Sequence, residues 1–114
     1  MRDASHAGSW YDSCGEVLRS QLTGWLEKAV AEGESVTGVQ GACRAVIAPH
    51  AGYSFSGPCA AHAYRHLDHT AVTRVFLLGP SHHHFTRRCC LTTCSTYDTP
   101  LGGITVRNYH PQLN

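Results

Sequence analysis

The sequence predicts an α/β fold in which a partial, open and mainly parallel sheet is flanked by helices. Two short apolar segments, residues 43–48 and 74–78, support this prediction, and a proline, Pro49 or Pro80, follows each of them closely. The alanine-rich residues between the two segments favour a helix. Strands that are apolar on both faces and joined by a helix are typical of neighbouring parallel strands with a right-handed crossover.

The composition bounds the class of protein. The chain has 114 residues, of which 42% are apolar and 15% are charged, and its formal net charge is +1. This length gives room for one domain, the apolar content favours a folded core, and the small charge argues against nucleic acid as a partner. The apolar run from Val75 to Leu78 is far too short to span a membrane. We therefore expect a protein of the cytoplasm, with the nucleus as a second location.

The first helix is predicted from about Glu16 to Ala31, where the apolar residues recur with helical spacing. The residues of its apolar face are Leu18, Leu22, Trp25, Leu26 and Ala29. The glycine-rich stretch 33–41 that follows has no periodicity and is predicted to be a loop.

Further elements are predicted in the second half of the chain. Pro58 suits the first position of a short helix that continues to Leu67. Strands are plausible at residues 89–95 and 104–108, because the Pro-Leu-Gly-Gly turn at 100–103 suits a hairpin.

Histidines follow both predicted strands. His50 lies just after the first strand and His82 just after the second. Neighbouring strands are about 4.8 Å apart, and ligands of open α/β sheets bind beyond the strand ends, so the two imidazoles can reach one metal ion. A histidine at such a position can equally be a loop residue bonded to the backbone, and both interpretations stay open. His83 and His84 are weaker candidates, because neighbours on an extended segment alternate in direction.

Other residues that could carry chemistry have simpler interpretations. His62, His66 and His69 have helical spacing, but their face is expected to be partly exposed to solvent. Trp10 is expected to plug the core, whereas the role of His6 stays open. The six cysteines are expected to be core residues or occasional metal ligands, and a structural zinc site is disfavoured because Cys89, Cys90 and Cys94 contain no C-x-x-C pair.

Three segments, in this order and spacing, resemble the Memo family, the mediators of ErbB-driven cell motility. They are SHAGSWY at residues 5–11, APHAGY at 48–53 and GPSHH at 79–83. Residues 60–64 and 97–101 are also similar to that family, so the resemblance covers residues 3–101. It implies a fold like the N-terminal part of the class III extradiol dioxygenases, whose pocket holds a non-haem iron.

The resemblance also implies a site and a role. His50 and His82 match metal-binding histidines of the family, and iron or copper is the implied metal. His6, His83 and Tyr53 match positions beside the pocket. The implied role is that of a signalling or adaptor protein in receptor tyrosine kinase-driven cell migration and cytoskeletal regulation. A receptor phosphopeptide would be its partner, and copper-dependent redox activity a further property.

The chain also departs from the family pattern. Family members are more than twice as long, and their third ligand, a cysteine, lies in a part that has no match here. We therefore expect residues 1–114 to form a single incomplete Memo-like domain, an N-terminal fragment with a metal half-site and a tendency to self-associate. Two alternatives remain: a non-haem iron dioxygenase-like oxidoreductase, and a truncated isoform without function. Whether the family member is an enzyme is open, and this truncated chain is not expected to be active.

Overall fold

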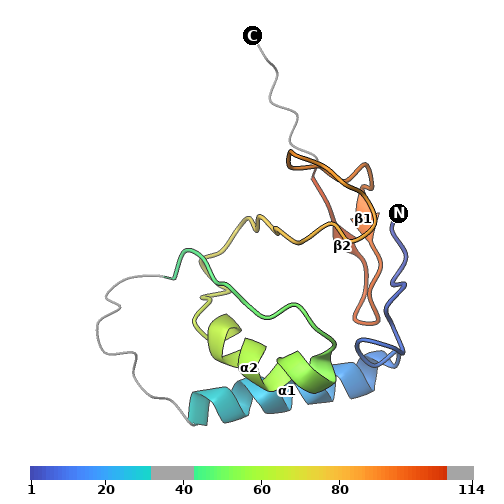
Figure 1. Cartoon of the computed structure of the whole chain (residues 1–114). Helices are drawn as coiled ribbons and strands as arrows, with labels where there is room; N and C mark the ends of the chain where they lie inside the picture. The colour runs from blue at the N-terminus through green and yellow to red at the C-terminus, as the bar shows by residue number, and fades with distance from the viewer. Residues whose placement is uncertain (32–42, 108–114) are drawn as a thin grey trace.

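The structure, a computed structural model, describes residues 1–31 and 43–107 (Figure 1). Its elements are helix α1 (Gly15–Ala31), helix α2 (Tyr53–Tyr64), strand β1 (Thr96–Tyr97) and strand β2 (Ile104–Thr105). The predicted loop at 33–41 lies outside the described residues. No helix in the described ranges has the length and the hydropathy needed to cross a bilayer.

Helix α1 confirms the prediction made from the apolar spacing. Leu18 and Ala29 of its predicted apolar face are 3% and 1% exposed, because this face packs against α2. Asp12 Oδ1 accepts the backbone N–H of Cys14 at 2.8 Å just before the helix begins. Glu16 in the first turn and Lys28 in the last turn have the charges that complement the helix dipole.

Helix α2 begins five residues earlier than predicted, so Pro58 lies inside the helix instead of at its first position. The proline interrupts the hydrogen-bond ladder because it has no N–H to donate. The helix begins at the carbonyl of Gly52, which accepts the N–H groups of Phe55 at 2.9 Å and Ser56 at 3.1 Å. At the other end, the Arg65 guanidinium donates to the carbonyl of Ala29 in the last turn of α1, which ties the two helices together.

The predicted hairpin forms, but its first strand lies C-terminal to the predicted residues 89–95. β1 and β2 are antiparallel, with Thr96 opposite Thr105 and Tyr97 opposite Ile104. The N-terminus adds to the free edge of β1: the Arg2 N–H donates to the Thr96 carbonyl at 2.8 Å, and the Arg2 carbonyl accepts from Asp98 at 2.8 Å. The first residues of the chain and the hairpin therefore lie side by side (Figure 1).

The two segments predicted as buried parallel strands have no regular secondary structure and pair with no neighbouring strand among the described residues. Ile47 is 98% exposed, and Val75, Phe76, Leu77 and Leu78 are 75–84% exposed. A strand that is apolar on both faces is stable only when both faces are covered, and here the two helices pack on each other. The parallel sheet and the dioxygenase-like fold stay predictions.

The buried core is small and lies between the two helices. Leu18 and Ala29 of α1 and Ser56 and Ala61 of α2 are each at most 5% exposed. The radius of gyration is 16.1 Å, which exceeds the value of about 13 Å for a compact domain of this size. None of the six cysteines is buried, which corrects the expectation that most are core residues.

Two glycines in the helices have opposite surroundings, and we expect opposite effects from the same substitution. A Cβ at Gly57 would come within 2.7 Å of Cε3 and Cη2 of Trp25, whereas a Cβ at Gly24 would meet nothing within 4 Å. Gly24→Ala is expected to stabilise the chain by about 0.5–1 kcal/mol through helix propensity. Gly57→Ala is expected to destabilise it by about 1 kcal/mol, because the cost of overpacking exceeds that gain.

Thermal unfolding followed by circular dichroism measures both effects. If both variants melt at a higher temperature than the wild type, the close contact between Gly57 and the Trp25 ring is wrong.

Candidate functional site

A buried serine in α2 forms hydrogen bonds with the loop that carries His50. Ser56 in the first turn of α2 is 3% exposed. Its hydroxyl donates to the carbonyl of Ala51 at 2.9 Å, and the Gly52 carbonyl lies at 3.2 Å from the same oxygen. The two residues after His50 are therefore anchored to the helix. This residue was missed in the sequence, although a serine that bonds back to the carbonyl four residues earlier is a known helix pattern.

The same loop is joined to the N-terminal segment by a backbone hydrogen bond. The N–H of Tyr53 donates to the carbonyl of Trp10 at 2.7 Å. A Cβ at Gly52 would lie 3.4 Å from this carbonyl oxygen, so the two backbones approach each other closely here. The Trp10 side chain is thereby placed next to His50, with 5.4 Å between the ring centroids.

The structure brings the two candidate metal ligands together. The Nε2 atoms of His50 and His82 are 3.0 Å apart, with 5.3 Å between ring centroids and 9° between ring planes, so the two rings meet edge to edge through their Nε2 atoms. A hydrogen bond at this distance needs one Nε2 as the donor and the other as the acceptor, so the roles of the two rings depend on their tautomers. Two histidine nitrogens that each lie about 2.0–2.1 Å from one ion are about 3 Å apart when they form a right angle at it. The observed separation therefore suits a shared ion.

A series of aromatic contacts runs from this pair to the N-terminus. Trp10 contacts His50 on one side, and on the other side its ring lies 5.0 Å from that of His6 in an edge-to-face arrangement. Trp10 is 36% exposed, so it is a wall of the site and not the core plug that the sequence suggests. His6 is separated from the pair by this indole and accordingly lies beside the site.

Within the described residues, no other histidine forms a group of three ligands with the pair. His83 and His84 are exposed, and the carbonyl of His84 accepts the Ser81 hydroxyl at 2.6 Å. His66 Nε2 lies 3.4 Å from Arg65 Nε, beyond the end of α2. In residues 1–31 and 43–107, no three His, Cys, Asp or Glu side chains come close enough together to hold a metal ion.

Tyr53, which the resemblance implies lies beside the pocket, packs among other aromatic side chains. Its ring contacts Tyr11 at 5.7 Å and Trp25 at 6.2 Å, so it belongs to an aromatic cluster on the side of α1. Burial, together with the nearby phenols of Tyr64 and Tyr11, raises the pKa of Tyr53 above its ordinary value of 10.0. Folding therefore favours the neutral, protonated form of the Tyr53 phenol.

This pKa shift makes stability depend on pH in alkaline solution. When the folded-state pKa is above the unfolded value, the folded chain holds its proton more tightly, so stability falls as the pH rises beyond about 10. We expect Tyr53→Phe to reduce this alkaline loss of stability and to leave the pH dependence between about pH 6 and 8 unchanged. Melting temperatures measured in both the neutral and the alkaline pH range test the expectation. An identical fall in melting temperature at alkaline pH in the wild type and the variant would contradict it.

With the geometry established, comparisons with known proteins identify the class. The sequence profile of the Memo family, described as "Memo-like protein", matches residues 2–110. The chain belongs to the Memo family. It is 51% identical over 100 residues to "Protein MEMO1" of Danio rerio and 49% identical over 100 residues to "Protein MEMO1" of Homo sapiens. It is also 50% identical over 105 residues to "Protein memo-1 homolog" of Caenorhabditis elegans.

These matches cover most of this chain but a minor part of each relative. They span 88% of the chain against 31% of the Danio rerio and Homo sapiens proteins, and 92% against 28% of the Caenorhabditis elegans protein. The chain thus spans about a third of the length of the relatives it matches.

Proposed function

We propose that this Memo-family chain contributes two histidine ligands, His50 and His82, to an iron or copper site of a signalling protein. The observation that carries the proposal is the 3.0 Å separation of the two Nε2 atoms, which come from residues 32 positions apart. Imidazole nitrogen suits both iron and copper. The aromatic wall of Trp10 and the anchored loop behind His50 support it, because a ligand held by its surroundings needs less ordering when a metal binds.

The donor set also defines the strength of the site. To bind one ion through both Nε2 atoms, each ring must have its proton on Nδ1, so the hydrogen bond between the rings is replaced by two metal–nitrogen bonds. Both ligands are neutral, and no third His, Cys, Asp or Glu joins them in the part of the chain that the structure describes. The site is therefore weaker than one completed by a thiolate or a carboxylate. When bound, the metal would supply Lewis acidity or electron transfer.

The wider role is proposed from family membership. The match shows membership of the Memo family. From what the resemblance to that family implies, we propose a function in receptor tyrosine kinase-driven cell migration and cytoskeletal regulation, a receptor phosphopeptide as the partner, copper-dependent redox activity, and a location in the cytoplasm and the nucleus.

Removing either ligand should weaken metal binding. We expect His50→Ala and His82→Ala each to lower the affinity for Cu²⁺ or Fe²⁺ at least about tenfold, since even changes to groups that support a ligand typically cost that much. Titration of the apo chain with each metal, followed by absorption or electron paramagnetic resonance spectroscopy, measures the affinities.

The matched control is the double variant His83→Ala/His84→Ala, which removes two exposed imidazoles next to His82. It should bind like the wild type. If the control loses binding and the two single variants keep it, the histidine run is a surface chelator and the shared site is wrong.

We also propose that the chain self-associates through its uncovered apolar segments. Val75 to Leu78 and Ile47 are largely exposed, and a contiguous exposed apolar patch is typical of a surface that associates with another chain. A second copy of the chain supplies a matching apolar surface.

Charges placed on these segments should therefore favour the monomer. We expect the wild type to elute as dimers or larger species in size-exclusion chromatography with light scattering, and Phe76→Lys/Leu78→Lys to shift the distribution towards the monomer. The control Val30→Lys changes an exposed apolar residue at the end of α1 and should leave the distribution unchanged. A wild-type monomer at all concentrations would rule the proposal out.

A further inference from the structure

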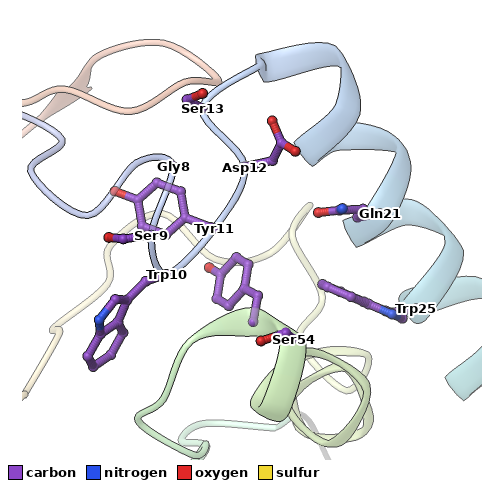
Figure 2. Close-up of a pocket in the computed structure, with 10 residues that line it drawn as sticks. Gly8, Ser9, Trp10, Tyr11, Asp12, Ser13, Gln21, Trp25 and Ser54 are labelled. Carbon is purple, nitrogen blue, oxygen red and sulfur yellow. The ribbon is translucent and has the colours of Figure 1, made fainter.

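A pocket that Trp10 helps to line lies next to the first turns of both helices. It is formed by the N-terminal loop, by α1 and by the first residues of α2, and its volume is about 410 Å³. Figure 2 shows Tyr11, Asp12, Gln21 and Trp25 arranged around this open space. Pockets that bind small ligands start at about 300 Å³, so the space is large enough for one small molecule or one side chain.

Three aromatic rings form the walls of this pocket. The Tyr53 ring stands at 90° to that of Trp25, with 6.2 Å between centroids, and at 42° to that of Tyr11, with 5.7 Å between centroids. Rings inclined to each other in this way are not stacked and can present their faces to the same space. The Trp25 ring is supported from behind by the backbone of Gly57, which approaches its six-membered ring so closely that a Cβ would not fit. The walls are thus held in place by α1 and α2.

The charge of the pocket is negative. Of the ten described residues that line it, Asp12 has the one ionised side chain, and it is half-buried. Gln21 and the hydroxyl groups of the lining serines add neutral polar groups. Aromatic faces attract a cation through their quadrupole when it lies within about 6 Å of the ring centroid, and a carboxylate at the same place adds to this attraction.

We propose that Tyr11, Trp25, Tyr53 and Asp12 form an aromatic cage that binds an alkylated ammonium group. Alkylated ammonium is favoured over a bare ammonium ion because its methyl groups lose little hydration and pack on the ring faces, while its charge interacts with the rings and with Asp12. The cation is either a free small molecule of the choline type or the methylated lysine side chain of a protein. This site is separate from the histidine pair and does not depend on metal binding.

A neutral isostere tests the role of the charge. The full chain is titrated with choline and with 3,3-dimethylbutan-1-ol, in which carbon replaces the ammonium nitrogen, while the indole N–H resonances of Trp25 and Trp10 are followed by nuclear magnetic resonance. We expect choline to shift the Trp25 resonance in a saturable way and the alcohol to bind at least about fivefold more weakly, a difference typical of one cation–π contact. Equal affinities, or no shift with either compound, would overturn the proposal.

A conservative substitution tests the role of Asp12. Asp12→Asn removes the charge and keeps the oxygen that accepts the Cys14 N–H, so the start of α1 is preserved. It should weaken choline binding about fivefold, the effect of one exposed charge pair. The control Asp3→Asn removes an exposed carboxylate that lines a different pocket and should change nothing. If Asp12→Asn binds choline as tightly as the wild type while its melting temperature is unchanged, the cage is wrong.

A third titration separates the two sources of the cation. A peptide with trimethyllysine is compared with the same peptide containing unmodified lysine. If the trimethyllysine peptide binds more tightly than both choline and the unmodified peptide, the cage reads a methylated side chain. If choline binds at least as tightly as the trimethyllysine peptide, the cage takes a free small cation. If the unmodified peptide binds as tightly as the methylated one, the preference for alkylated ammonium is wrong.

Discussion

The hydrogen bond from the N–H of Tyr53 to the carbonyl of Trp10, at 2.7 Å, is the contact on which both sites depend. It joins the loop before α1 to the first residue of α2, and Gly52 lets the two backbones come this close. On one side of the bond, the Trp10 indole lies against His50. On the other side, the Tyr53 ring turns towards Tyr11 and Trp25. A single backbone contact therefore separates an imidazole site from an aromatic pocket.

The parts of the fold that depend on local chemistry could be predicted from the sequence. The apolar spacing of α1 and the Pro-Leu-Gly-Gly turn of the hairpin are properties of neighbouring residues, and both gave the right type of element. The start of α2 could not be predicted from Pro58, because the Gly52 carbonyl and the buried Ser56 hydroxyl begin the helix earlier and the ladder tolerates one missing N–H. These bonds depend on the positions of single side-chain and carbonyl groups, which periodicity does not show.

The candidate site was predictable in part for a similar reason. The proximity of His50 and His82 followed from placing both residues at the ends of extended segments, although these segments do not form the strands from which the proximity was argued. Tyr53 was expected beside the pocket from the family resemblance, and this placement stays a prediction. Tyr53 is the first residue of α2, and its ring contacts that of Trp25 in α1. The wall that Trp10 forms needs a long-range contact and has no signature in the sequence.

His50 and His82 are held in place to different extents, and this limits the affinity with which the pair alone can bind a metal. His50 is supported by Ser56 and Trp10, whereas His82 lies in an exposed bend that follows the uncovered residues Leu77 and Leu78. An exposed hydrogen bond contributes only about 1 kcal/mol, which is comparable to the cost of fixing one residue of backbone. A metal that binds both rings must therefore supply the free energy that orders the His82 segment, and its measured affinity is reduced by that amount. A partner surface that covers residues 75–78 would order the same segment in advance, so coverage of the apolar segment and metal affinity are linked through His82.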